Sequence, residues 1–272
     1  MDSNLKSSVH IESIEDLFRE IERLTVKVRH FRTGKMDYYG HVVGIKECPE
    51  GKVPFVHQDH FYDEKGRVIK MEKYENDFSK PTKRIYFYAG DDPHVAESVW
   101  FDRYDRIDNI HRYLYDKAAG LMVGRAEYTK EGRIFYTITS KYDRSDPPLL
   151  VQEIWNDLKG TVLKDMLYQY DGQGRMTEER LFGSGGIFKG INRFAYDDRG
   201  LLVERKWQNS RGITSSTYLY EYDDAEEVTR VTIQDGEGKI RSRQEFFRDE
   251  VGNVLEERWY DRDGKLIRHL KY

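Results

Sequence analysis

The chain has 272 residues, of which 38% are hydrophobic, 35% charged and 14% aromatic, and its formal net charge is −4. No run approaches the roughly 18–20 consecutive apolar residues of a transmembrane helix, and the single cysteine, Cys48, excludes an internal disulfide. Because basic and acidic residues are interleaved throughout, we expect neither a nucleic-acid partner nor a membrane one. The first residues lack the apolar core of a secretory signal, which predicts a cytoplasmic protein.

Residues 13–24 predict an amphipathic helix. Ser13 and Asp16 have the spacing of a capping box, and the apolar residues that follow have helical spacing: Ile14, Leu17, Phe18, Ile21 and Leu24. Two roles are open for this helix. It caps the open end of a repeat array, since such arrays need end caps, or it binds a partner.

The next segments predict strands. Residues 26–31 and 37–45 form the expected hairpin around Thr33-Gly34-Lys35, and 46–147 continues as less regular strands. Near its end, Asp146-Pro147-Pro148 carries an insertion of about two residues relative to the regular repeat that follows.

A glycine-centred repeat dominates the rest of the chain. Most repeat glycines are followed two residues later by a large apolar residue and eight residues later by an aromatic one. The steps alternate between 14 and 12 residues, a period of 26, and only Glu226 is not a glycine among positions 160, 174, 186, 200, 212, 226, 238, 252 and 264. Residues 149–200 also align with 201–252 without a gap, with 14 identities in 52 positions, which indicates an internal duplication.

Each repeat reads as a turn followed by one strand. Glycine after Asp-x-x suits a turn residue with positive φ, and the intervening residues are rich in strand formers. Strands joined by tight turns pair antiparallel. The sequence therefore predicts a mainly β fold: an antiparallel β-hairpin repeat array, a curled or spiral meander with a short N-terminal helix. A four-bladed propeller with one blade per 52 residues is the alternative. We divide the chain into a helix-and-hairpin cap, 1–59, and a repeat domain, 60–272.

The segment Tyr168-Gln169-Tyr170-Asp171-Gly172-Gln173-Gly174-Arg175-Met176 resembles the Y-x-Y-D-x-x-G-R-L core of the YD repeats of RHS-type proteins. Residues 194–200 and 61–68 are close variants, and Tyr115-Asp116 through Gly120 is a form lengthened by one residue. The resemblance implies a β-hairpin array, of the kind that RHS proteins use as shells around toxin domains or as cell-surface recognition modules. MORN-like antitoxin repeats, which also pair an aromatic residue with a turn glycine, are a rival match.

The tryptophans form the main candidate binding site. Trp155, Trp207 and Trp259 lie 52 residues apart, and Trp100 is an earlier member displaced by the insertion. One interpretation is a structural stripe within a repeating core. The other is a row of aromatic platforms for a glycan or for an extended segment of a protein partner, since Trp is favoured at interfaces.

His57-Gln58-Asp59-His60 is the only compact His/Asp cluster in the sequence. On a strand, alternation would place His57 and Asp59 on one face and His60 on the other. No HExxH or CxxC motif accompanies them, so we expect no metal, no cofactor and no catalytic residue.

The function that we expect is non-enzymatic: a binding or scaffold module for a protein partner, with an immunity- or antitoxin-like protein as one form. Two alternatives stay open. One is a glycan-binding module that uses the tryptophans, and the other is an enzyme or metal site near His57 and His60.

Overall fold

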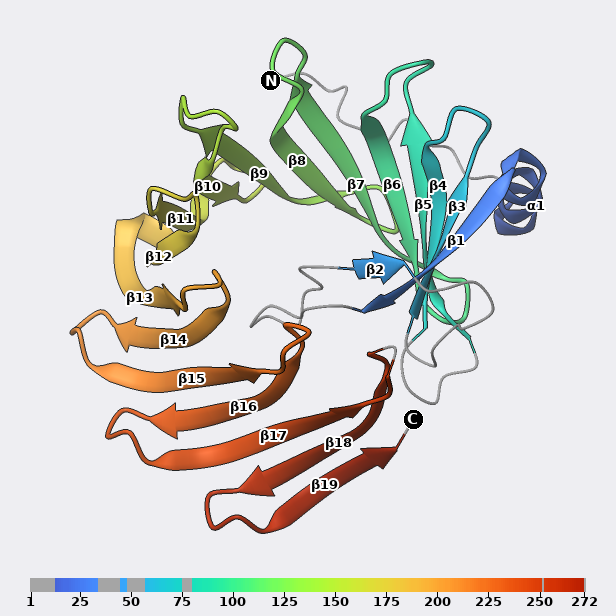
Figure 1. Cartoon of the computed structure of the whole chain (residues 1–272). Coiled ribbons are helices and arrows are strands. Elements are labelled where there is room, and N and C mark those ends of the chain that lie inside the picture. Colours follow the sequence, from blue (N-terminus) through green and yellow to red (C-terminus); the bar gives the residue numbers. More distant parts are fainter. Residues whose placement is uncertain (1–12, 34–44, 48–56, 75–79, 251, 272) are drawn as a thin grey trace. The chain divides into compact units, whose positions relative to one another are not determined.

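The computed structural model describes residues 13–33, 45–47, 57–74, 80–250 and 252–271 (Figure 1). These residues form one α-helix and nineteen strands, all paired antiparallel where their register is defined, which confirms the predicted mainly β hairpin array. The chain divides into two compact units. Unit 1 comprises residues 1–139 and 156–160, and unit 2 comprises 140–155 and 161–272.

The predicted helix is present as α1 (Ile14–Leu24). Its N-cap is Ser13, whose side-chain oxygen accepts a hydrogen bond from the backbone N–H of Asp16 at 3.2 Å. This bond satisfies one of the N–H groups that a helix leaves free at its start. Within the residues described, no helix has the length and apolar character needed to cross a membrane.

Unit 1 is a meander that begins with two strands on either side of β1. Strand β1 pairs with β2 and with β3, and from β3 onward each strand pairs with the next. The bounds are β1 (Lys27–Thr33), β2 (Ile45–Glu47), β3 (His57–Tyr62), β4 (Val68–Lys73), β5 (Thr82–Tyr88), β6 (Val95–Phe101), β7 (Ile107–Asp116), β8 (Leu121–Thr129) and β9 (Ile134–Tyr142), the last of which ends in unit 2.

Two sequence-based boundaries can be placed on these strands. Thr33, which the prediction placed in the turn of the first hairpin, is the last residue of β1 and pairs with Ile45, while residues 37–44 of the predicted second arm lie outside the described residues. The predicted division between a cap and a repeat domain, at residues 59 and 60, falls inside β3. Strand β3 pairs with β1, so both belong to the same sheet.

The core of unit 1 lies between α1 and one face of the sheet. Ile85, Val99, Ile110 and Tyr128 are paired across four successive strands and are buried. From α1, Ile21 joins this cluster, and the ring of Phe18 lies 5.3 Å from that of Phe101. The helix therefore covers a face of this sheet, whereas the cap interpretation placed it at the open end of the array.

Unit 2 continues the hairpin array. Its strands are β10 (Leu150–Asn156), β11 (Val162–Tyr170), β12 (Met176–Gly183), β13 (Ile187–Tyr196), β14 (Leu202–Asn209), β15 (Thr214–Tyr222), β16 (Val228–Asp235), β17 (Ile240–Arg248), β18 (Val254–Asp261) and β19 (Leu266–Lys271), with the 3₁₀ turn η1 (Ser184–Gly186) before β13. Every pair from β11–β12 to β18–β19 is antiparallel, and each contains a bulge. Bulges increase local twist, as a curled sheet requires. The propeller alternative is wrong, because four-stranded blades would interrupt this ladder.

The repeat glycines occupy the turn position that the sequence predicts. In the β11–β12 turn, the N–H of Gly174 donates to the carbonyl of Asp171 at 3.0 Å, and Asp171 N–H donates to the carbonyl of Arg175 at 2.9 Å. The Asp171 carboxylate accepts from the N–H groups of Gln173 and Arg175, both at 2.9 Å. This is the three-residue hairpin loop that needs a residue in the left-handed region.

The same conformation recurs at all nine repeat positions from 160 to 264, including Glu226 at φ 62°. Two predicted irregularities are also confirmed. The loop closed by Asp143 N–H reaches the carbonyl of Leu149, two residues further than in the regular turn. Gly120 bonds to Asp116 across one extra residue.

Candidate functional site

The two turn edges of the unit 2 sheet differ in how they are built. One edge is formed by turns 171–174, 197–200, 223–226 and 249–252, and we call it the clipped edge. On it, the tyrosine before each turn donates a hydrogen bond to a backbone carbonyl 20 residues earlier: Tyr170 to Leu150 at 2.7 Å, Tyr196 to Met176 at 2.8 Å and Tyr222 to Leu202 at 2.7 Å. At the next repeat Arg248 takes the place of the tyrosine and donates to the carbonyl of Val228 at 3.3 Å.

We call this hydrogen bond between a tyrosine and an earlier backbone carbonyl the clip. The tyrosines that form it are half-buried. Burial raises the pKa of Tyr222 to about 12, so the phenol keeps the proton that it donates. Directly after one of these turn glycines, Leu201 is buried.

The opposite edge is formed by turns 183–186, 209–212, 235–238 and 261–264, and we call it the open edge. Three of these turns, those of β14–β15, β16–β17 and β18–β19, lie along the left side of the unit 2 strands in Figure 1. One or two residues after each turn glycine stands an exposed aliphatic side chain. These four residues, the apolar edge row, are Ile187 (60% exposed), Ile213 (57%), Ile240 (46%) and Leu266 (45%).

The apolar edge row is accompanied by exposed cations. A Lys or Arg lies within two residues of every member: Lys189, Arg211, Lys239, Arg241 and Lys265, all exposed. The turn aspartates of this edge are engaged locally, since Asp235 and Asp261 accept hydrogen bonds from their own turn N–H groups at 2.9–3.0 Å. On the clipped edge the exposed acids Asp198, Asp224, Glu226 and Glu250 stand with the exposed Arg199. The open edge also has two exposed acids, Glu237, which pairs with Lys239 at 2.7 Å, and Asp263, so it combines apolar side chains with charges of both signs.

The three predicted tryptophans of unit 2 are half-buried and lie on one face of the sheet. Lys164 Nζ lies 5.1 Å from the centre of the Trp155 ring, and Arg268 Cζ lies 4.6 Å from that of Trp259. Trp207 packs over Gly190, where an added Cβ would lie 2.5 Å from Trp207 Cζ2. Each ring is thus packed against groups of its own sheet. That these tryptophans bind a ligand stays a prediction.

A buried polar row crosses the same face. The Glu179 carboxylate accepts from Asn192 Nδ2 at 3.3 Å, and the Asn192 carbonyl oxygen accepts from Arg205 Nε at 3.0 Å. Glu179 is 5% exposed and Arg205 3%. The buried charges of this row do not face water, and complementary partners on adjacent strands replace it.

Trp100 belongs to unit 1 and lies in a polar cluster on the sheet face opposite the core. Arg84 Cζ is 4.5 Å from the Trp100 ring centre, and the His111 ring is 5.8 Å away. His111 Nε2 lies 3.1 Å from Glu127 Oε2, which also accepts a hydrogen bond from Tyr136. Burial pushes the pKa of Glu127 upward, but its interactions with His111 and Tyr136 outweigh burial and leave that pKa below its usual value.

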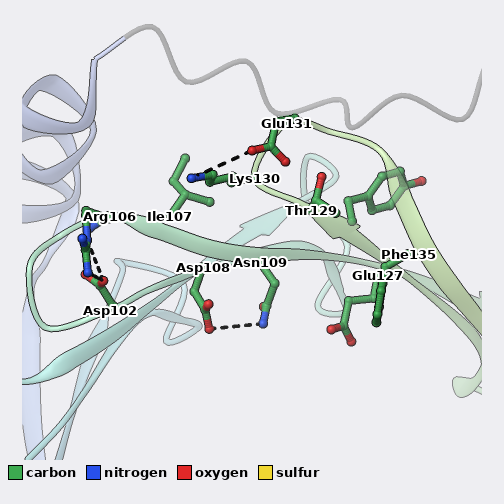
Figure 2. Close-up of a pocket in the computed structure, with 11 residues that line it drawn as sticks. Asp102, Arg106, Ile107, Asp108, Asn109, Glu127, Thr129, Lys130, Glu131 and Phe135 are labelled. Carbon is green, nitrogen blue, oxygen red and sulfur yellow. Dashed lines mark hydrogen bonds and ion pairs between the residues drawn. The ribbon is translucent and has the colours of Figure 1, made fainter.

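A cavity of about 550 Å³ adjoins this cluster (Figure 2). It lies between the turn that begins at Asp102 and the turn that follows Thr129, and Glu127 lines it. Asn109 Oδ1 is buried in its wall and has no hydrogen-bond partner among the described residues. Buried polar atoms of this kind are commonly satisfied by solvent, and the lining mixes acids with bases, as the Asp102–Arg106 ion pair in Figure 2 shows.

The side chains of the predicted His57–His60 cluster do not come together at one site. His57 Nε2 lies 3.3 Å from Asp59 Oδ1, and the His57 ring stacks on Tyr74 at 4.4 Å. His60 lies on the other face of β3, as strand alternation predicts, and contacts Gln58 at 3.3 Å. Burial lowers the pKa of His60. Across the described part of the chain no group of three or more His, Cys, Asp or Glu side chains could hold a metal ion. Cys48 lies outside the described residues.

The open edge is the feature that sequence reasoning missed. Its aliphatic residues were visible as part of the glycine-centred pattern. The pattern did not distinguish the two turn edges, because both have an apolar residue after the glycine. A partial signal was the tyrosine that precedes the turn on the clipped edge at positions 170, 196 and 222, although Arg248 replaces it at the fourth clipped turn and Tyr260 precedes the last turn of the open edge.

Comparisons with known proteins give weak similarities. No protein-family model matches the chain, and no curated protein matches it. A porin-like protein from Bacteroides uniformis is 11% identical over 91% of this chain and 98% of its own, with a TM-score of 0.42. The TcdB2–TccC3 structure with Cdc42 is 12% identical over 80% of this chain, with a TM-score of 0.31, and the Tc holotoxin pore of Photorhabdus luminescens is 12% identical over 80%, with a TM-score of 0.17. The chain spans 16% and 17% of those two chains.

Proposed function

We propose that this protein is a non-enzymatic β-repeat scaffold that binds a protein partner along the open edge of unit 2. The apolar edge row carries the proposal. Four large aliphatic side chains, each about half exposed, follow the turn glycines of four successive hairpins, one residue after the glycine at Ile187 and Ile213 and two residues after it at Ile240 and Leu266. Contiguous exposed apolar surface on a folded domain is a mark of protein interaction sites.

The two edges of the same sheet provide an internal comparison. On the clipped edge the residue after the turn glycine is covered, as at Leu201, and on the open edge the equivalent residues Ile187 and Ile213 are exposed. Because the turns on both edges are built from the same repeat, the fold does not require exposed aliphatic side chains. A binding surface would explain why such side chains are present on one edge.

The test is capture from a lysate of the source cell with the full chain and with an Ile187→Ser, Ile213→Ser, Ile240→Ser triple variant. We expect the full chain to retain a protein that the variant releases. A matched control is Leu255→Ser, which removes an aliphatic side chain of similar exposure from β18 outside the row. Retention of the same protein by the triple variant, once circular dichroism shows that it is folded, would refute the proposal.

The finer roles are distinguished by what is captured. An immunity- or antitoxin-like scaffold would retain a toxic protein encoded beside it and would neutralise that protein in cells. A glycan-binding module would instead bind an oligosaccharide in a Trp207-dependent manner. We favour the protein partner, because the half-buried tryptophan rings already contact Lys164, Arg268 or the backbone at Gly190.

A further inference from the structure

The cavity of unit 1 has a hydrogen-bond acceptor in its wall that lacks a donor. Its volume is about 550 Å³, which is the size of a small-molecule site. Asn109 donates through Nδ2 to the Asp108 carboxylate at 3.5 Å, and its Oδ1 is left buried without a partner among the described residues. An unsatisfied buried acceptor is costly, so a ligand that brings a donor would gain free energy by binding here.

The carboxylate of Glu127 is held in place at the same cavity. Its Oε2 atom lies 3.1 Å from His111 Nε2 and accepts a hydrogen bond from Tyr136, and the other ring nitrogen of His111 contacts the Tyr113 hydroxyl at 3.3 Å. Burial pushes the pKa of Glu127 upward, but these contacts keep it below its usual value, so the carboxylate is ionised at neutral pH. A fixed and ionised carboxylate is a preorganised acceptor for a charged donor.

The lining of the cavity has more acids than bases. Each of its two cations is paired with a carboxylate of the same turn: Arg106 with Asp102 at 2.7 Å, and Lys130 with Glu131 at 3.9 Å. The carboxylates that remain in the lining belong to Asp108 and Glu127. In Figure 2 both side chains, with that of Asn109, point away from Lys130. Negative charge therefore accompanies the unused acceptor.

The ligand that fits this lining is an organic cation and not a metal ion. Over the described ranges of the chain, no group of three or more His, Cys, Asp or Glu side chains could hold a metal. The cavity is also lined by Phe135, which is 63% exposed. The face of an aromatic ring attracts ammonium and guanidinium groups and packs against carbon chains.

We infer that the cavity formed by β7, β8 and β9 binds a small organic cation. The ammonium or guanidinium group of this ligand would donate to Asn109 Oδ1 and to the carboxylates of Asp108 and Glu127, and Phe135 would cover its carbon atoms. The site lies within unit 1. It goes beyond the proposed function, and neither proposal depends on the other.

The experiment is isothermal titration calorimetry of the full chain with agmatine, which has a guanidinium group at one end and an ammonium group at the other. The comparison ligand is γ-guanidinobutyrate, in which a carboxylate replaces the ammonium group at nearly the same length. We expect agmatine to bind, and Asp108→Asn and Glu127→Gln each to weaken it roughly tenfold, as the loss of a charge-assisted hydrogen bond does. The comparison ligand should bind at least tenfold more weakly than agmatine, and Lys130→Gln should strengthen agmatine binding.

Matched variants separate the site from general effects on the protein. Asp224→Asn, at an exposed turn of unit 2, is the control for Asp108→Asn, which lies at an exposed position and leaves the contacts of His111 in place. Phe135→Leu should weaken agmatine, whereas Phe247→Leu, at an exposed phenylalanine of β17, should not.

Three results would overturn the inference. They are the absence of agmatine binding to the folded wild-type chain, equal affinity for agmatine and γ-guanidinobutyrate, and an affinity for agmatine that is unchanged in both Asp108→Asn and Glu127→Gln. Circular dichroism of each variant shows that it is folded, so a loss of binding reports the site.

Discussion

At the nine repeat positions from 160 to 264, Glu226 is the only residue that is not glycine. Its backbone is in the left-handed region at φ 62°. A Cβ makes that region unfavourable by roughly 1–2 kcal/mol, against which glycine loses some entropy on folding. We expect Glu226→Gly to raise the free energy of unfolding by about 1 kcal/mol, measured by urea denaturation. Glu226→Ala is the control, since it removes the carboxylate and keeps the Cβ. Equal stability of the glycine and alanine variants would contradict the strain at this turn.

Substitution of Tyr222 tests the clip, the hydrogen bond between its hydroxyl and the Leu202 carbonyl. Loss of its hydroxyl in Tyr222→Phe should cost about 1 kcal/mol at neutral pH, because the Leu202 carbonyl loses its 2.7 Å hydrogen bond. The pKa of Tyr222 rises from 10.0 to about 12, chiefly through burial. The folded state therefore favours the protonated phenol, and its contribution is complete below pH 10 and is lost as the pH rises toward 12.

The corresponding measurement is urea unfolding of both proteins from pH 8 to pH 12. The stability difference between wild type and Tyr222→Phe should shrink as the pH rises through this range. Tyr104→Phe is the control, because Tyr104 is 59% exposed. A difference that stays constant to pH 12 would show that the hydroxyl is not held by the clip.

At the scale of elements, α1 is a packing element for unit 1. Ile21 is 5% exposed and belongs to the core cluster with Ile85 and Val99. Ile21→Ala should destabilise unit 1 by about 2–4 kcal/mol, the usual range for a large-to-small change in a core. Hydrogen exchange should then be faster in β5–β8 and unchanged in β15–β18. Glu22→Ala, at an exposed position of the same helix, is the control. Unchanged exchange in β5–β8 would leave partner binding as the role of the helix.

The elements could be predicted from sequence because their signals are local. Ser13 and the spacing of Ile14 to Leu24 mark the helix, and Asp-x-x-Gly marks most of the turns, with Asn209 in place of the aspartate in one and Glu226 in place of the glycine in another. Whether a charged side chain is exposed or buried depends on its partners on the neighbouring strands. The strand register and the bulges determine which residues those partners are. Glu179 and Arg205 look like surface charges in the sequence, yet Asn192 bridges them in a buried row. The open edge escaped prediction for the same reason.

At the scale of the whole molecule, the two compact units can be followed separately. Trp100 lies in unit 1, and Trp155, Trp207 and Trp259 lie in unit 2. In Trp100→Phe, tryptophan fluorescence reports unit 2 alone. We expect Ile85→Ala, added to this background, to shift the urea midpoint seen by circular dichroism and to leave the fluorescence midpoint in place, because Ile85 packs in the core of unit 1. A parallel shift of both signals would show that the units unfold together.

The clip has a further consequence for how such a chain can change in length. Each tyrosine reaches a carbonyl 20 residues earlier, so every hairpin is fastened to the one before it. An insertion or deletion of a few residues within a hairpin would move the hydroxyl away from its acceptor, whereas the gain or loss of a complete 26-residue hairpin re-creates the same clip at the new junction. Relatives of this protein should therefore differ in length by multiples of 26 residues within unit 2, and smaller length differences should gather in loops such as 143–149, outside the regular repeat.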